Sequence, residues 1–329
     1  MKKILMIATG GTIASRNRGN GLEPELSSEE LLDCVPEIAR SCAVTAVQPF
    51  NLDSTNVCGG HWLGIARIIE ERYAEFDGFV VTHGTDTMAY TAAALTYLVQ
   101  NSAKPIVLTG SQKSVYPRDT DARRNLSDAF FYCADNGASG VHIVFDGNVI
   151  LGTRAKKTRT RSFNAFSSID FPATAVMRDG KPFYYIEEKK PQGAPRFFHA
   201  LNENVFVLKM IPGLKADIFD YLEAHCDGLI IESFGAGGLP NYDNDAFFAR
   251  LKAFLARGKT AVLTTQVERE GSAMDTYAVG RKLRACGNVL EARCMTLEAT
   301  VAKLMWILAF AEGDEVARLF YQPVARDIF

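Results

Sequence analysis

Short apolar runs alternate with longer stretches of helical periodicity along almost the whole chain, and this alternation limits the fold more than any other feature. The runs have the length of buried strands and lie at residues 4–8, 44–49, 78–82, 105–109, 141–145, 205–209, 228–232 and 260–264. Apolar residues at three- and four-residue intervals predict amphipathic helices at residues 60–73, 87–99, 121–134, 214–225, 243–257 and 297–311. Strands that alternate with helices form mostly parallel sheets covered on both faces, so the sequence predicts an α/β protein.

The length of 329 residues exceeds the usual size of one domain, and the 47% of hydrophobic residues is enough for two cores. The periodicity fails once, from residue 177 to about residue 204, where Asp179-Gly180, a charged run at 187–190, Pro191 and Pro195 interrupt it. We therefore predict an N-terminal domain at 1–180, a linker at 181–204 and a C-terminal α/β domain at 205–329.

Charge and cysteine content narrow the class of partner. Lys and Arg together number 36 against 38 Asp and Glu, and no run of like charge offers a surface to nucleic acid or an anionic membrane. A small-molecule or protein partner is favoured.

The apolar run at 4–8 is too short for a signal peptide or a membrane span, so we expect a cytoplasmic protein. Seven cysteines without CxxC spacing indicate reduced thiols rather than disulfides or a structural zinc site.

Hydroxyl-bearing residues gather just after four of the predicted strands. The segments read Thr9-Gly10-Gly11-Thr12, Asp53-Ser54-Thr55, His83-Gly84-Thr85-Asp86-Thr87 and Gly110-Ser111-Gln112. In open parallel sheets, ligands bind beyond the carboxyl ends of the strands, which share one edge. We therefore expect these four segments to line one site.

Neither the segment at 9–12 nor the one at 83–87 determines by itself what reaction or ligand the site serves. Gly10 and Gly11 let the backbone approach a ligand closely and expose Thr12, yet a glycine-rich turn also suits a phosphate group at a helix N-terminus. The turn lacks the pattern of a P-loop and of a dinucleotide fingerprint. Thr85 or Asp86 would equally serve as a cap for the helix that follows. His83 has no evident acid partner, and we interpret it as structural.

Taken together and in this order, the segments resemble the signatures of the bacterial-type L-asparaginase family, TGGTIAS at 9–15 and HGTDTM at 83–88. Further matches cover most of the chain, at residues 53–55, 109–112, 152–157, 163–166, 212–213, 235–238, 264–266 and 295–299. The resemblance implies a larger N-terminal α/β domain, a smaller flavodoxin-like C-terminal domain, and a homo-oligomer, either a dimer or a dimer of dimers. One chain's C-terminal domain would complete the active site of its neighbour.

The resemblance also implies hydrolysis of L-asparagine to L-aspartate and ammonia without a metal or organic cofactor. Glutamine is longer by one methylene, which leaves weak glutaminase activity open. Thr12 would attack the amide carbon, and Thr85 held by Lys157 would position water or pass protons, although the order of attack of the two threonines stays open. Asp86 suits the α-ammonium of the substrate. The family lysine is the last residue of Arg-Ala-Lys-Lys, which favours Lys157 over Lys156. Further substrate contacts are expected from Gly11, Asp53, Ser54, Thr55, Gly84, Ser111 and Gln112.

Two departures from the family pattern leave alternatives open. Leu22 stands where family members carry a lid tyrosine, and we predict that Tyr277 of a neighbouring subunit partly replaces it, unless Tyr277 merely packs against its own helix. Cys294 replaces an aspartate before Met-Thr, with no evident consequence. A sensor that binds amino acids without catalysis is one alternative. Another is the amidase component of a tRNA amidotransferase, which would need an RNA-binding partner and an N-terminal extension, whereas strand residues begin here at residue 3.

Overall fold

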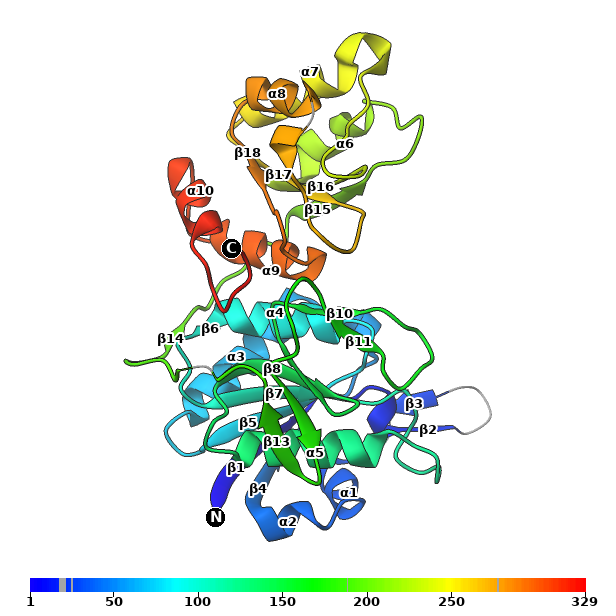
Figure 1. Cartoon of the computed structure of the whole chain (residues 1–329), viewed down its shortest axis with the longest axis vertical. Helices are drawn as coiled ribbons and strands as arrows, with labels where there is room; N and C mark the ends of the chain where they lie inside the picture. Colours follow the sequence, from blue (N-terminus) through cyan, green and yellow to red (C-terminus); the bar gives the residue numbers. More distant parts are fainter. Residues whose placement is uncertain (18–21, 25, 188, 277) are drawn as a thin grey trace. The chain divides into compact units, whose positions relative to one another are not determined.

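The computed structural model, shown in Figure 1, describes residues 1–17, 22–24, 26–187, 189–276 and 278–329. The chain forms two compact units, residues 1–199 and residues 200–329. Each unit has its own sheet with helices packed against it, which confirms the predicted α/β class with a larger N-terminal part and a smaller C-terminal part.

The sheet of unit 1 has eight strands among the described residues, in the order β13-β12-β9-β8-β7-β5-β1-β4. Parallel pairing joins β4 (Cys42–Val47), β1 (Lys2–Ala8), β5 (Gly78–Thr82), β7 (Pro105–Thr109) and β8 (Gly140–Phe145). Antiparallel pairing adds β9 (Asn148–Leu151), β12 (Ala175–Arg178) and β13 (Lys181–Tyr184). Every residue of β5 is buried, as expected of a central strand covered on both faces. Because β1, β5 and β7 are parallel neighbours, their carboxyl ends lie side by side at one edge of the sheet.

Helices cover both faces of this sheet. Figure 1 shows α5 (Ala122–Ala134) on one face and α4 (Met88–Leu98), with α3 (Gly59–Arg72) beside it, on the other. Two shorter helices, α1 (Ser28–Asp33) and α2 (Ile38–Ser41), lie near β4. On the α5 face, Leu126 and Phe130 belong to one buried cluster with Ile4, Val80 and Val107. This apolar packing fixes the strands whose ends carry the expected site.

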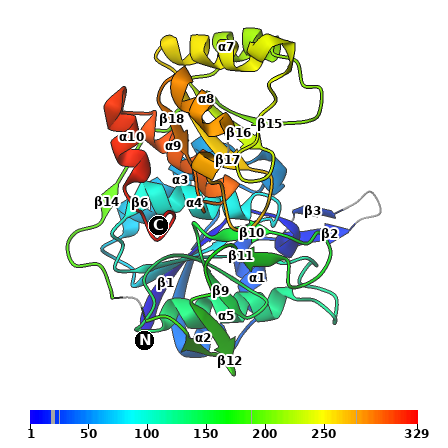
Figure 2. The same ribbon diagram turned by 45° about the horizontal axis from the view of Figure 1, so that its top comes forward.

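Among the described residues of unit 1, three two-stranded sheets accompany the main sheet. β10 (Ala155–Lys157) pairs with β11 (Phe166–Ser168), and Lys157 lies opposite Phe166 in this hairpin. Figure 2 shows β10 beside α4, in agreement with the contacts between these two elements. The other pairs are β2 (Ser15–Asn17) with β3 (Leu22–Pro24), and β6 (Val99–Gln100) with β14 (Arg196–Phe197). The hairpin of β10 and β11 is the element that carries the expected catalytic lysine.

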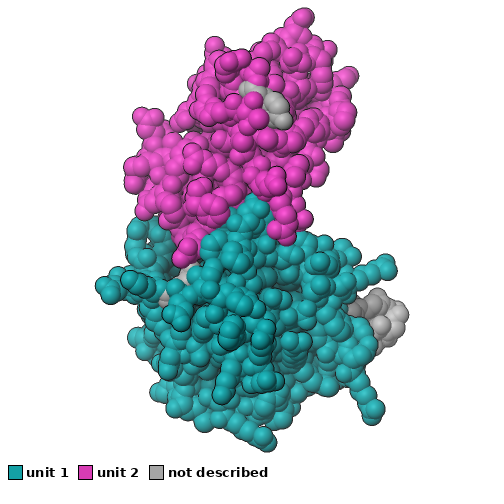
Figure 3. All heavy atoms as spheres, viewed as in Figure 1, with its two compact units in different colours: residues 1–199 teal, residues 200–329 magenta. Residues whose placement is uncertain are grey.

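Unit 2, coloured separately in Figure 3, has a parallel sheet in the order β15-β16-β17-β18. Its strands are β15 (Val205–Lys209), β16 (Gly228–Ser233), β17 (Thr260–Thr265) and β18 (Val289–Glu291). Its helices are α6 (Ile218–His225), α7 (Tyr242–Ala256), α8 (Ala278–Cys286), α9 (Leu297–Ile307) and α10 (Asp314–Tyr321). Lys303 on α9 and Asp327 form a fully buried ion pair at 2.6 Å, which ties the end of the chain to that helix.

The predicted helices match α3, α4, α5 and α7 within one residue at each end, whereas α6 begins four residues later and α9 ends four residues earlier than expected. The interval 181–204, predicted as a linker, contains β13 and β14. Within the described part of the chain, no helix combines the length and the apolar character needed to cross a membrane.

Candidate active site

Two glycines bring the loops after β1, β4 and β5 into backbone contact. Gly10 and Gly11 have φ angles of 101° and 81°, in the left-handed region that favours glycine. A Cβ atom on Gly10 would lie 2.5 Å from the Leu52 nitrogen, and one on Gly11 would lie 2.4 Å from the Gly84 nitrogen. The Gly11 N–H donates to the Leu52 carbonyl at 3.0 Å. Only residues without a side chain allow this approach, which sets Thr12 beside the loop of Gly84.

Thr12 opens the short 3-10 helix η1 (Thr12–Ala14) and is half-buried. Its side chain makes no hydrogen bond to another described residue. Ser54 lies close by, because a Cβ atom on Gly84 would come within 2.6 Å of the Ser54 Oγ. The Thr87 hydroxyl donates to the Ser54 carbonyl at 2.7 Å and so joins the two loops. The structure thus gathers Gly11, Ser54 and Gly84 around the turn that carries Thr12.

Asp53 stabilises its own loop in this structure. Its carboxylate accepts hydrogen bonds from the Thr55 N–H at 2.9 Å and from the Thr55 hydroxyl at 2.8 Å. Asp53 thereby caps the 3-10 helix η2 (Ser54–Asn56). Both Asp53 and Thr55 are exposed, whereas Ser54 is buried.

Lys157 joins the hairpin of β10 and β11 to the loop after β5. Its ammonium donates to the Thr85 Oγ1 at 2.7 Å and to the Asp86 carboxylate at 2.6 Å. The Lys157 side chain is 17% exposed, while that of Asp86 is 57% exposed. Thr85 is buried. A mostly buried cation that holds a hydroxyl and an open carboxylate is a cluster suited to proton transfer and to binding a charged ligand.

Gln112 lies between the Thr85 loop and the segment that precedes β11. The Thr85 hydroxyl donates to the Gln112 Oε1 at 3.3 Å, and the Gln112 Nε2 donates to the Ser162 carbonyl at 3.2 Å. Ser111 is buried, and its hydroxyl donates to the Lys113 carbonyl within its own loop. Gln112 therefore contacts the cluster directly, whereas Ser111 supports the loop.

His83 joins Thr91 on α4 to the backbone of the loop that carries Thr85. The Trp62 indole N–H donates to the Thr91 hydroxyl at 2.9 Å, so this hydroxyl is free to donate to the His83 Nε2, also at 2.9 Å. The remaining His83 Nδ1–H then donates to the Gly84 carbonyl at 2.7 Å. Burial lowers the pKa of His83 to about 4, so the ring is neutral near pH 7. This agrees with the interpretation of His83 as structural.

Two predicted residues lie beyond what the structure describes. Tyr277 is outside the described residues, and Leu22 contributes its backbone to β3 while its side chain is outside the described part.

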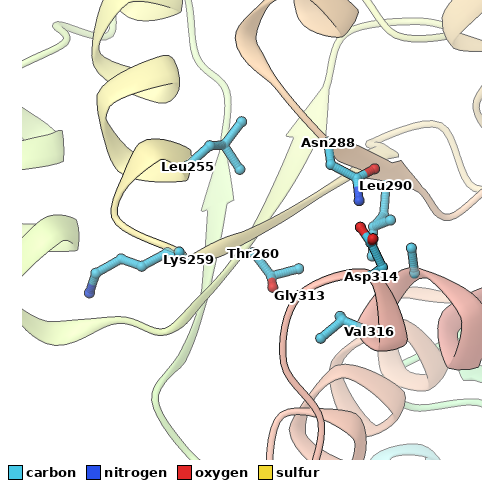
Figure 4. Close-up of a pocket in the computed structure, with 10 residues that line it drawn as sticks. Leu255, Lys259, Thr260, Asn288, Leu290, Gly313, Asp314 and Val316 are labelled. Carbon is cyan, nitrogen blue, oxygen red and sulfur yellow. The ribbon is translucent and has the colours of Figure 1, made fainter.

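A cavity of about 180 Å³ in unit 2 is shown in Figure 4, where Asn288 and Asp314 lie near each other. None of the predicted site residues lines it. Among the described side chains, no three of His, Cys, Asp or Glu are grouped so as to hold a metal ion.

Comparison with known protein families assigns both halves of the chain. The family described as "Asparaginase, N-terminal" matches residues 3–190, and the one described as "Glutaminase/Asparaginase C-terminal domain" matches residues 204–320. The chain belongs to the asparaginase family. The resemblance expected from TGGTIAS and HGTDTM is thereby confirmed.

Three similar proteins match nearly the whole chain. An L-asparaginase of Thermococcus kodakarensis is 34% identical over 99% of both sequences, and its solved structure superposes with a TM-score of 0.93 over 99% of both chains. A structure described as a probable cytoplasmic L-asparaginase from Campylobacter jejuni has a TM-score of 0.86 at 25% identity, covering 98% of this chain and all of the other. A glutamyl-tRNA(Gln) amidotransferase subunit of Pyrococcus furiosus is 33% identical over 93% of this chain and 72% of its own.

The motifs quoted in the sequence analysis do not include two buried polar residues that contact the Gln112 loop. Asp121 accepts hydrogen bonds from the backbone of Gln112 and Lys113, and Asn125 donates to the Gly110 carbonyl. Burial raises the pKa of Asp121, and the two N–H donors offset part of that rise. The available signal was an aspartate at the first position of the helix predicted at 121–134, which by itself indicates only a cap.

Proposed function

We propose that this chain is an L-asparaginase that hydrolyses the side-chain amide of L-asparagine with Thr12 as nucleophile. The observation that carries the proposal is the contact of Lys157 with both Thr85 and Asp86. Family membership and full-length similarity to an L-asparaginase support it. An amide hydrolase needs a nucleophile, a route for protons and donors for the oxyanion, and the loops after β1 and β5 carry groups of each kind.

The proposed reaction proceeds through an acyl-enzyme. The Thr12 Oγ forms a bond to the amide carbon as its proton passes to a base, and the oxyanion accepts hydrogen bonds from backbone N–H groups of Thr85 and the Gly11-Thr12 turn. The C–N bond then breaks as the nitrogen gains a proton and leaves as ammonia. Water, positioned by Thr85 and Lys157, adds to the ester and releases aspartate. Lys157 can accept a proton only as a neutral amine, after its ammonium has lost the proton that it donates to the Thr85 hydroxyl.

Substrate recognition follows from charge. The exposed carboxylate of Asp86 would bind the α-ammonium, and Ser54 with neighbouring backbone amides would bind the α-carboxylate. Gly11 and Gly84 leave room for the substrate beside the turn. Asp53 and Thr55 would act by holding the Ser54 loop, and Ser111 by holding Gln112.

We further propose a cytoplasmic homodimer or dimer of dimers in which Tyr277 of a neighbouring subunit reaches the Thr12 site. The Campylobacter jejuni relative, described as a probable cytoplasmic L-asparaginase, supports the location. Sedimentation velocity combined with an activity assay tests the oligomer, because a fully active monomer contradicts a shared site. Tyr277→Phe removes one hydroxyl and keeps the packing volume, and a kcat at least about tenfold lower supports a role in proton transfer.

The second candidate is the amidase part of a tRNA-dependent amidotransferase, favoured by the 33% identity to the amidotransferase component of Pyrococcus furiosus. This chain spans 72% of that relative, compared with 99% of the Thermococcus kodakarensis L-asparaginase. Ammonia release from asparagine, from glutamine and without substrate decides between them. Release from free asparagine supports the L-asparaginase, whereas release only in the presence of glutamyl-tRNA and a partner protein supports the second candidate.

A further inference from the structure

Asp121 stands directly before α5, where an aspartate ordinarily caps the first turn of its own helix. In the fully described stretch around it, residues 119–126, its carboxylate makes no such bond, and the Thr120 hydroxyl accepts from the Ala122 N–H at 3.0 Å instead. The carboxylate accepts from the Gln112 N–H at 2.8 Å and from the Lys113 N–H at 3.0 Å. The helix forgoes a cap of about 1 kcal/mol, and the loop after β7 gains two charge-assisted hydrogen bonds.

Asn125, one turn further along α5, completes this anchor. Its Nδ2 donates to the Asp121 carboxylate at 3.2 Å and to the Gly110 carbonyl at 3.0 Å. Its Oδ1 accepts from the Asp146 N–H at 2.9 Å. Asp121 is 7% exposed and Asn125 is 1% exposed. Two buried side chains, one directly before α5 and one near its start, therefore hold the loop 110–113 at both ends.

The anchored loop directs the Gln112 side chain at Thr85. The Ser162 carbonyl can only accept a hydrogen bond, so it takes the Nε2 end of the Gln112 amide and leaves Oε1 facing Thr85. The Thr85 hydroxyl donates to this Oε1 and turns a lone pair towards the Lys157 ammonium, 2.7 Å away. The direction of the Thr85 proton is thus set by the position of Gln112.

We infer that Asp121 is a positioning residue, which orients the Thr85 hydroxyl through the backbone of Gln112 and on which turnover depends. The inference rests on the proposed function, since it concerns the proton path of that reaction. When the loop shifts, the Gln112 Oε1 no longer accepts a hydrogen bond from the Thr85 hydroxyl. This hydroxyl can then rotate, and it no longer presents a fixed lone pair to the Lys157 ammonium. Asp121 contacts neither Asp86 nor Ser54, which are proposed to bind the two charged groups of the substrate, so we expect its main effect on kcat rather than on KM.

Asp121→Asn tests this with little change in volume, because it replaces one acceptor oxygen by an NH₂ group that faces an N–H donor. We expect kcat to fall by about 10–100-fold, as for small displacements of catalytic groups, with KM within about twofold of wild type. Asp128→Asn is the matched control. Asp128 lies on α5 with the same 7% exposure as Asp121 and makes no described bond to the loop 110–113, so the kcat of Asp128→Asn should stay at the wild-type value.

A double-mutant cycle separates positioning from general loosening of the fold. If Asp121 acts through Gln112, Gln112→Leu lowers kcat by a similar factor, and Asp121→Asn lowers it less than about twofold further in that background. Effects that multiply in the double variant overturn the inference, as does an unchanged kcat in a folded Asp121→Asn protein. If Asp121→Asn melts below the assay temperature, Asp121→Glu replaces it, since it keeps both acceptor oxygens but displaces the loop by one methylene.

Failure of the proposed function gives a different result. A wild-type protein that releases no ammonia from asparagine contradicts the proposed L-asparaginase activity. Crystal structures of the wild type and of Asp121→Asn then test the positioning role of Asp121 independently of activity. A Gln112 Oε1 that separates from the Thr85 hydroxyl in the variant supports it. A Gln112 that keeps its wild-type bond to Thr85 overturns it.

Discussion

Lys157 donates a hydrogen bond of 2.7 Å to the hydroxyl of Thr85, a residue that lies on a different element 72 positions earlier in the chain. Thr85 follows the central strand β5, whereas Lys157 ends the strand β10 of a hairpin that packs beside α4. The same ammonium holds Asp86 at 2.6 Å. One cation therefore organises both the group proposed to pass protons and the group proposed to bind substrate.

Lys157→Met should remove this organisation while keeping the aliphatic stem. We expect kcat/KM to fall at least about 1,000-fold, because the proton path and the orientation of Asp86 are lost together. Lys156→Met is the control, since Lys156 is the next residue in the chain and its side chain makes no described hydrogen bond to Thr85 or Asp86. Steady-state ammonia release measures both variants. Equal losses in the two lysine variants would contradict the assignment of Lys157.

Gly11→Ala should damage the site more than the fold. Gly11 has φ 81° and ψ 179°, a backbone conformation essentially restricted to glycine that costs another residue about 1–3 kcal/mol. The new Cβ atom would also lie 2.4 Å from the Gly84 nitrogen, which forces the two loops apart. We expect a lower melting temperature and a kcat lower by about 100-fold, as for a displacement of about 1 Å. Gly64→Ala on α3 is the matched control, because a Cβ atom there meets no described atom within 4 Å. It should leave activity unchanged and raise the free energy of unfolding by up to about 1 kcal/mol.

Asp128 should make stability depend on pH. Burial raises its pKa from 3.8 to about 6, and Arg124 at 3.6 Å offsets only part of the rise. The folded state thus binds a proton more tightly than the unfolded state, so stability rises as the pH falls from above 6 towards 4. Asp128→Asn removes this titration. Its advantage in free energy of unfolding over wild type should be about 2–3 kcal/mol greater at pH 8 than at pH 4, at about 1.4 kcal/mol for each unit of pKa difference. Denaturant titrations at the two pH values measure it, and an advantage independent of pH contradicts the raised pKa.

The alternation of strands and helices was readable because buried parallel strands and amphipathic helices leave strong periodic signals. The predicted strands at 78–82 and 105–109 coincide with β5 and β7. The antiparallel strands β9, β12 and β13 were not predicted, because four-residue strands at the margin of a sheet carry little periodicity. The parallel strand β18, of three residues, was missed for the same reason.

The candidate site was readable where motifs carry it. Thr85, Asp86 and Lys157 were named from family motifs, and the structure brings them into contact. Asp121 was not found, because its role depends on where its carboxylate turns. The sequence indicates that Asp121 stands at the start of a helix, but only the folded loop shows that its carboxylate accepts from the Gln112 N–H instead of capping α5.

The measurement that tests the central proposal most directly is ammonia release from L-asparagine by wild type, Thr12→Ala and Thr12→Ser, assayed side by side with their melting temperatures. The wild type should release ammonia, and Thr12→Ala should fall at least about 1,000-fold at an unchanged melting temperature, because removal of a nucleophile costs orders of magnitude. Thr12→Ser should keep measurable turnover, since it retains the hydroxyl. A Thr12→Ala protein with more than about a tenth of the wild-type rate would contradict Thr12 as the nucleophile.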